Sequence, residues 1–107
     1  MDDADLLRTA AAALENLAAR TTAGDWRIGG LLATRPEVVA HRPDGGTEHV
    51  AEARTASAAW ITALSPAVAE PLAGWLRAAA DRSPVEPAAA ELAGLLLDRL
   101  PGGGPDH

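Results

Sequence analysis

Residues 60–79 read WITALSPAVAEPLAGWLRAA, an almost wholly apolar stretch that contains two prolines. The residue before a proline avoids helical backbone angles, so Ser65 is expected to end one helix. Because proline is favoured at the first position of a helix, Ser65 should also cap a new helix that begins at Pro66. The stretch therefore predicts two helices, over residues 55–64 and 66–80.

The second proline, Pro71, lies further inside its predicted helix. Its missing N–H would have bonded the carbonyl of Ala67, and we expect a kink at that point. Apolar side chains recur along the same helix at three- and four-residue steps and predict a buried stripe of Val68, Leu72, Trp75, Leu76 and Ala79. Trp75 is accordingly assigned to the core.

The beginning of the chain has the same helical period over residues 3–20. The apolar residues at these steps are Leu6, Leu7, Ala10, Leu14, Leu17 and Ala18. Aspartates at the start of this segment and Arg20 at its end suit the dipole of a helix. Gly24 follows, and glycine suits the left-handed backbone that ends many helices.

The period then changes to that of strands. Short runs with β-branched or aromatic residues, separated by turn residues, lie at 26–28, 37–42 and 47–53. Pro43 and Asp44 are expected at the centre of a type I turn, with Gly45 at positive φ. We predict an antiparallel hairpin over 37–53, and a possible third strand over 26–33 interrupted by paired glycines.

Two further helix starts are expected from capping patterns. Thr55 is the predicted N-cap of the helix over 55–64. Ser83 and Glu86 match a capping box, although Pro87 could instead mark the true start of the last helix. That helix should cover residues 87–100, with Ala88, Leu92, Leu95, Leu96 and Leu100 facing inward.

These elements predict an α+β fold: an N-terminal helix, a small antiparallel sheet of two or three strands, then three helices packed on one face of the sheet. The length of 107 residues fits a single domain, which we place at 1–100. The glycine-rich residues 101–107 are expected to be a flexible tail.

Composition excludes several classes of chemistry. The chain has no cysteine, which excludes disulfides, thiolate catalysis and cysteine-bound zinc. Loops with the phosphate-binding pattern G-x-G-x-x-G and a G-x-S-x-G nucleophile elbow are both missing. Every basic side chain is arginine, which together with the many alanines, glycines and prolines indicates a GC-rich, actinobacterial type of genome. We expect no cofactor and no resident metal.

Charge and hydropathy bear on partners and on location. The formal net charge is −6, and the excess of acidic residues falls at the two ends of the chain, in 1–19 and 55–107. Acidic flanks repel a phosphate backbone, so nucleic-acid binding is disfavoured. The acidic N-terminus is unlike a signal peptide, and no uncharged apolar run is long enough to span a membrane. A cytoplasmic protein without membrane contact is expected.

Two polar clusters are candidate sites. A tight hairpin turn could place His41 and His49 on neighbouring strands with a carboxylate between them, which would suit a metal ion or acid–base chemistry; the alternative is a solvated sheet face. Arginines recur in the middle of the chain at Arg20, Arg27, Arg35 and Arg42, and could converge on an anion such as a nucleotide. Surface ion pairs with nearby carboxylates are the alternative role for them.

Trp26 is the remaining candidate ligand contact. It begins a strand between Asp25 and Arg27, where an indole could stack on a ligand. As one of only three large aromatic residues, it is more simply explained as packing between the first helix and the sheet.

The chain resembles the small phage and prophage proteins of the Ead-like family over about residues 6–80. The segment ARTTAGDW resembles the family signature A-T-P-G-P-W, and the later helical region resembles its A-x-x-I-A-x-x-x-P-x-x-V-x-x-L-L pattern. The closest matches are Gly24, Trp26, Ala59, Ile61, Ser65, Pro66, Val68 and Leu72. The chain departs from the pattern at Ala23 and Asp25, which stand where prolines are usual, and at the additional Pro71.

The resemblance implies mobile-element ancestry, a cytoplasmic setting and a plan of helix, hairpin and helices; it carries no catalytic residue. From it and from the composition we expect a non-enzymatic accessory protein that acts through protein contacts, as a homodimer joined by Ala/Leu helix faces and with a further protein partner. The alternatives are a small-anion binder at the arginine-bearing sheet (Trp26, Arg27, Arg42) and a metal-dependent enzyme at His41 and His49.

Overall fold

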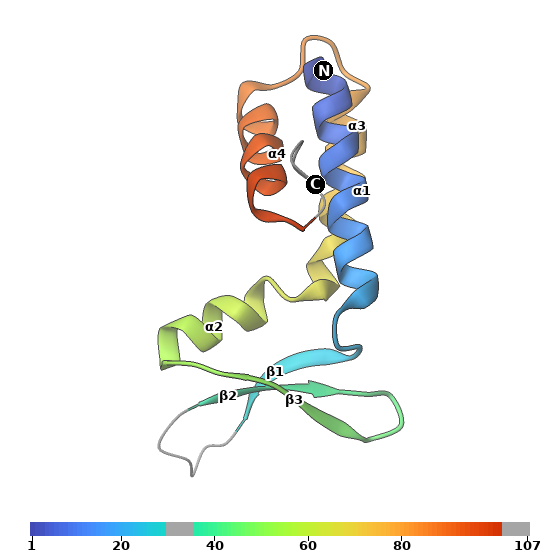
Figure 1. Cartoon of the computed structure of the whole chain (residues 1–107). Helices are drawn as coiled ribbons and strands as arrows, with labels where there is room; N and C mark the ends of the chain where they lie inside the picture. The colour runs from blue at the N-terminus through green and yellow to red at the C-terminus, as the bar shows by residue number, and fades with distance from the viewer. Residues whose placement is uncertain (30–35, 102–107) are drawn as a thin grey trace. The chain divides into compact units, whose positions relative to one another are not determined.

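The computed structural model describes residues 1–29 and 36–101 and has the predicted α+β class (Figure 1). In chain order the elements are α1 (Asp3–Arg20), β1 (Asp25–Gly29), β2 (Glu37–His41), β3 (Thr47–Glu52), α2 (Thr55–Ala63), the 3-10 turn η1 (Pro66–Val68), α3 (Ala69–Ala80) and α4 (Pro87–Arg99). The predicted first helix and hairpin are confirmed. The chain's predicted tail, apart from Pro101, and positions 30–33 of the third strand lie outside the described residues.

The region 1–100, for which we predict one domain, consists of two compact units. The helical unit comprises residues 1–20 and 69–101, and the sheet unit comprises residues 21–29 and 36–68. In the helical unit, α3 and α4 both pack against α1. The predicted packing of three helices on the sheet therefore holds for α2, whereas α3 and α4 find their main partner in α1.

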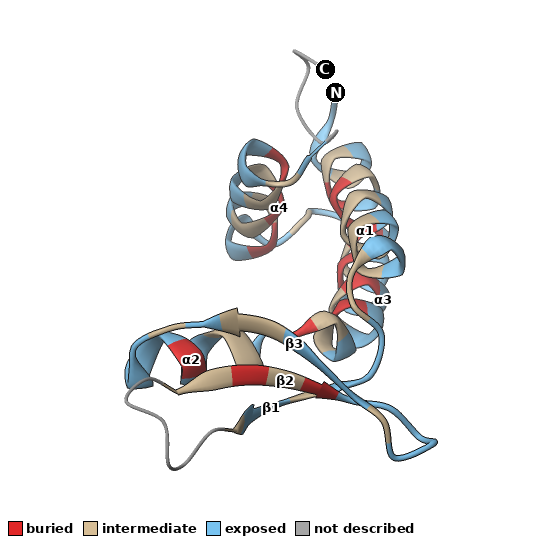
Figure 2. Ribbon diagram, turned by 60° about the horizontal axis from the view of Figure 1, so that its bottom comes forward, coloured by how far each residue is buried: buried red, intermediate tan, exposed pale blue. Residues whose placement is uncertain are grey.

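The core of the helical unit is made mostly of alanine. Its buried residues are Leu7, Ala10 and Ala11 of α1, Ala73, Leu76 and Ala80 of α3, and Ala89, Ala93 and Leu97 of α4 (Figure 2). Alanine adds no side-chain bulk beyond Cβ, so the helix backbones can approach closely. Each alanine buries little apolar area, however, and the three leucines supply most of the hydrophobic stabilisation.

The predicted inward stripe of α3 is right at Leu76, but the other buried residues of α3 and α4 lie one position after the predicted ones. Trp75 is 44% exposed, whereas its neighbour Leu76 is fully buried. In α4, Ala88 and Leu95 are exposed, whereas the buried residues are Ala89, Ala93 and Leu97. The physical reason is steric: the alanines of these faces allow close contact with α1, one leucine on each helix fills the remaining space, and Trp75 and Leu95 lie outside the contact.

The sheet unit is a three-stranded antiparallel sheet in the order β1-β2-β3, so the possible third strand is present over Asp25–Gly29. In β2 the side chains alternate, with Val38 and Ala40 fully buried. The helix α2 contacts β1 and β2 and contributes the buried Ala58 (Figure 2). The apolar face of the sheet is thus the one that α2 covers.

The predicted turn between β2 and β3 is confirmed. Gly45 has φ 89° and its N–H donates to the carbonyl of Arg42 at 2.9 Å, which closes the turn around Pro43 and Asp44. A register shift at Val38/Val39 interrupts the ladder between the two strands. A bulge of this kind is why alternation in the sequence did not fix the register.

The opening stretch, 60–79, divides at Ser65 as predicted. The first helix, α2, ends at Ala63, and buried Ser65 accepts a backbone hydrogen bond from Val68 at 2.9 Å. The segment after Ser65 is a 3-10 turn, and α3 begins only at Ala69. Pro71 therefore lies in the first turn of α3, where its missing N–H needs no partner, and the reason for a kink inside one long helix disappears.

Two predicted caps are wrong. Thr55 is the first residue of α2, and the N-cap is Arg54, which forms no side-chain capping hydrogen bond. The last helix begins at Pro87 with Glu86 as N-cap and no side-chain cap, so the alternative start at Pro87 is correct and the capping box is not formed. Proline fixes a helical φ at the first position of a helix, which explains why α4 begins at Pro87 and not after a capping box at Ser83.

Candidate functional site

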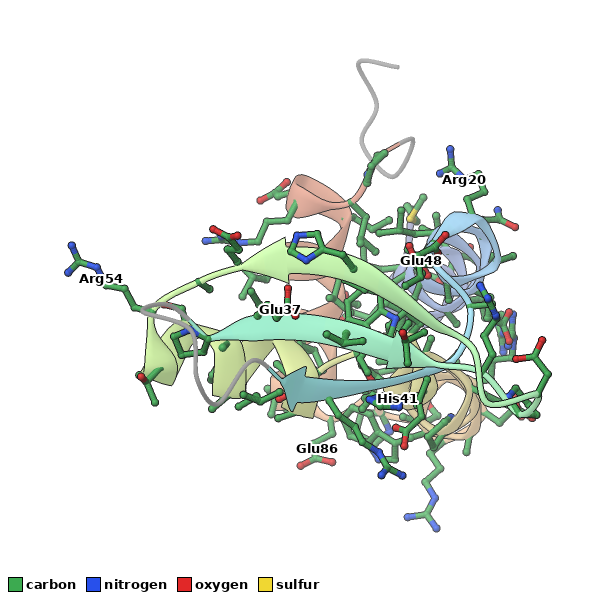
Figure 3. The ribbon with its side chains drawn as sticks, turned by 90° about the horizontal axis from the view of Figure 1, so that it is seen from below. Arg20, Glu37, His41, Glu48, Arg54 and Glu86 are labelled. Carbon is green, nitrogen blue, oxygen red and sulfur yellow. The ribbon has the colours of Figure 1, made fainter. Side chains whose placement is uncertain are left out.

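The outer face of the sheet, opposite α2, holds the predicted histidine cluster. The register places His49 opposite Val39 and His41 opposite Thr47, so the two histidines share a face but lie diagonally. His49 Nδ1 lies 2.9 Å from Glu37 Oε2, which makes an exposed contact between β3 and β2. Glu37 and His41, at the two ends of β2, are labelled in Figure 3. The carboxylate pairs with one histidine and does not bridge both.

A metal site needs three or four converging ligands. Within residues 1–29 and 36–101, no group of three histidine, aspartate or glutamate side chains is arranged to hold a metal ion. The Glu37–His49 pair is exposed, so its chemistry is that of a solvated surface contact rather than of a desolvated acid–base pair.

The arginines named above are engaged locally. Arg27 Nε pairs with Asp25 Oδ2 at 2.7 Å on the same strand, and Arg42 Nε lies 3.7 Å from Asp44 Oδ1 in the hairpin turn. Arg20 belongs to the helical unit, where its Nε donates to the carbonyl of Asn16 at 3.3 Å, and Arg35 lies outside the described residues. Arg20, Arg27 and Arg42 thus each have their own neighbouring acceptor, and these three arginines do not converge on one anion site.

Trp26 serves the fold of the sheet unit. Its Nε1 donates to the carbonyl of Thr22 at 3.0 Å, and the side chain is half-buried. It pairs across the ladder with the fully buried Ala40, on the face that α2 covers. An indole fixed in this way contributes a packing surface and has little freedom to stack on a ligand.

The most exposed apolar surface of the sheet unit lies on α2, and the sequence reasoning missed it. Trp60 is 70% exposed and Leu64 is 55% exposed. Together with the exposed residues Ala56, Ala59 and Ala63 they form one side of the helix, here named the α2 face. A signal was present in the sequence: no charged residue occurs between Arg54 and Glu70, so α2 has no charged side to turn toward water.

The helical unit has a surface hollow of about 370 Å³ beside the exposed Trp75. It is lined by Trp75, Ala78, Ala79, Arg82, Pro84 and Glu86. Arg82 and Glu86 form no ion pair with any described residue, so their charges are free for solvent.

Comparisons with protein-family models, with curated proteins and with solved structures found no match for this chain. Among the described helices, none combines the length and the apolar character needed to cross a membrane. The function of this chain is therefore inferred from its own surfaces, of which the α2 face is the most apolar in the sheet unit.

Proposed function

We propose that this chain is a non-catalytic accessory protein that acts by binding protein surfaces, and that the α2 face is its contact surface. The observation that supports the proposal is the exposure of Trp60 at 70% on a helix without any charged residue. Tryptophan is enriched among the few residues that dominate binding energy at protein interfaces. Apolar residues gathered on one exposed face are a feature of interaction sites rather than of ordinary surface.

The polar residues of the sheet favour binding over catalysis in this proposal. His49, Arg27 and Arg42 each lie beside a single carboxylate in exposed positions. Catalytic groups are usually desolvated and arranged around a cleft, because burial is what shifts their pKa values and strengthens their electrostatic effect. The anion-binding and metal-dependent alternatives thus have no arrangement of described residues in their favour.

Membership in the Ead-like family, a phage or prophage origin and a cytoplasmic setting are part of the proposal. Their support is the resemblance of the segment around Gly24 and Trp26 to the family signature, and in this chain both residues serve the fold. Gly24 has φ 118°, and a Cβ there would lie 2.8 Å from the carbonyl oxygen of His41. Residues that only hold a fold are what a family of binding proteins with different partners would share.

The experiment is affinity capture from a lysate of the native host, with quantitative mass spectrometry. The wild-type chain is compared with Trp60→Ala and with Trp75→Ala, a matched control that removes an exposed tryptophan from the helical unit. Loss of a hot-spot residue costs about 2 kcal/mol or more, so capture should fall by about 30-fold with Trp60→Ala. Trp75→Ala should retain the captured protein; equal recovery with all three chains would contradict the proposal.

A further inference from the structure

We infer that the α2 face binds a second copy of this chain, with the two α2 helices antiparallel about a two-fold axis and Arg54 of each copy over the C-terminal turn of the partner copy's α2. The inference rests on the proposed function and names the partner of the same surface. A two-fold pair buries the same patch on both copies, so the patch must be complementary to itself in charge and in shape.

The charge argument begins at Arg54. This arginine is the N-cap of α2, where the positive end of the helix dipole disfavours a cation. Its side chain forms no hydrogen bond or ion pair with any described residue, and Figure 3 shows it directed away from the ribbon. The first turn of α2 contains no acidic residue and the last turn contains no basic one. Both ends of α2 thus lack the charges that would suit the helix dipole.

An antiparallel copy corrects both defects at once. Antiparallel pairing of two α2 helices brings each Arg54 from the positive end of its own helix to the negative end of the other copy's helix. The residue at the opposite end is Leu64, the C-cap, whose own N–H donates to Trp60. A parallel arrangement would instead place the two arginines side by side, where like charges repel.

The net charge of the chain favours contact between two copies through an uncharged surface. At −6, two copies repel each other wherever their acidic surfaces meet. The α2 face contains no charge, so two copies can meet there without opposing carboxylates. A basic partner protein would gain nothing from this surface, because it offers no acidic group to pair with.

The shape of the α2 face is also suited to itself. Trp60 and Leu64 are four residues apart and form a raised ridge, because side chains at that spacing lie on the same side of a helix. The exposed Ala59 and Ala63 form a low strip beside it, and Ala56 lies in line with the ridge. In an antiparallel pair the ridge of each copy can lie on the low strip of the other, which is the ridges-into-grooves packing of helices.

The size of the surface sets the expected strength. α2 has 9 residues and is about 14 Å long at 1.5 Å per residue. One face of so short a helix offers much less than the roughly 800 Å² per partner of a standard stable interface. We therefore expect a weak dimer, with a dissociation constant in the micromolar range or above, that forms as concentration rises.

Analytical ultracentrifugation of the full chain from about 1 µM to 1 mM tests the pairing. The wild type should pass from monomer toward dimer, and Trp60→Ala should raise the dissociation constant at least tenfold. Trp75→Ala should behave as the wild type. A wild-type chain that stays monomeric over the whole range, or a dimer that Trp60→Ala leaves unchanged, would overturn the inference.

Arg54→Glu separates pairing from folding. It places an anion at the favoured end of its own helix, so the free energy of unfolding should be unchanged or higher. The same anion would face the negative end of the other copy's helix, and the dissociation constant should rise about tenfold. Arg82→Glu makes the same change of charge in the helical unit and should leave the dimer intact. Equal effects of the two substitutions would contradict the arrangement.

The lack of cysteine allows the antiparallel geometry to be tested by cross-linking. Superposing Arg54 on Leu64 puts the two-fold axis near residue 59, so Ala59→Cys should form a disulfide-linked dimer under mild oxidation. With Ala56→Cys, the cysteines of the two copies would lie about 9 Å apart along the helix direction, which is beyond the span of a disulfide. This variant should cross-link poorly; efficient cross-linking at 56 would indicate a parallel pair and would contradict the inference.

The two proposals fail in different ways. A strictly monomeric wild type that still captures a host protein through Trp60 would overturn the second copy as partner and leave the proposed function standing. A chain that neither dimerises nor captures any protein in a Trp60-dependent manner would remove both.

Discussion

At the scale of single residues, the turn after α1 depends most strongly on one backbone conformation. Gly24 has φ 118°, a region that side chains other than glycine rarely adopt. The site is crowded as well, since a Cβ would lie 2.8 Å from the carbonyl oxygen of His41 and 3.4 Å from the Cβ of Ala40. The glycine therefore allows β1 to approach β2 directly after the turn.

Gly24→Ala should destabilise the protein by about 2 kcal/mol, because it adds left-handed strain to a steric clash with backbone. Urea unfolding followed by circular dichroism measures the change. Gly45→Ala is the informative comparison, since φ is 89° there but nothing lies within 4 Å of the added Cβ. It should cost about 1 kcal/mol from strain alone. Equal losses at the two positions would show that the contact with His41 is unimportant.

At the scale of elements, α3 shows how close packing selects the buried face of a helix. Ala73 is fully buried against α1 and α4, whereas its neighbour Gly74 has open space around it. Added side-chain atoms should therefore change stability in opposite directions at these two adjacent positions. The same preference explains why Trp75 is exposed although its helix is apolar on several sides.

Ala73→Leu should destabilise the helical unit by about 1–3 kcal/mol, because the added atoms overfill a packed core. Gly74→Ala should stabilise it by about 0.5–1 kcal/mol, since alanine is the better helix former and its Cβ meets no atom. Thermal unfolding should show a lower melting temperature for Ala73→Leu and a higher one for Gly74→Ala. A neutral Ala73→Leu would mean that α1 and α3 are not in close contact at this point.

At the scale of the whole molecule, an ion pair joins the N-terminal helix to a helix much later in the chain. Both terminal nitrogens of the Arg77 guanidinium donate to Glu15, at 2.8 Å from Nη1 to Oε2 and 2.5 Å from Nη2 to Oε1. This hydrogen bonding lowers the pKa of Glu15 below its usual 4.5 and raises that of Arg77. The pair is partly exposed, so salt and solvent weaken it.

Glu15 should make stability depend on pH in acid. Its pKa is lower in the folded state than in the unfolded one, so its contribution is present above pH 4.5 and is lost as pH falls through the folded value. The difference in free energy of unfolding between wild type and Glu15→Gln should be larger at pH 7 than at pH 3, as measured by urea denaturation. Glu91→Gln controls for the loss of a surface carboxylate on α4. A difference that does not change with pH would mean that the pair is broken in solution.

The sequence by itself determined the local features of this protein. The α+β class, the first helix, the hairpin with Gly45 at positive φ and the break at Ser65 follow from hydrophobic period, proline and glycine, all of which act over a few neighbouring residues. It also placed the candidate histidines on adjacent strands, because a tight turn leaves little freedom of pairing. The predicted cap at Thr55 is wrong by one residue, because α2 already includes Thr55 and its N-cap, Arg54, forms no side-chain hydrogen bond that the sequence could signal.

Only the tertiary structure decided which faces are buried and what the polar residues contact. The exposure of Trp60 and Trp75, the pairing of His49 with Glu37 and the separate partners of Arg27 and Arg42 depend on contacts between segments far apart in sequence or on a bulge in register. In α2, which has no charged residue, and in α3, where Trp75 and Leu76 are neighbours, hydropathy alone does not fix the buried face. The closest possible packing of alanine faces, which is a property of two helices together, makes that choice.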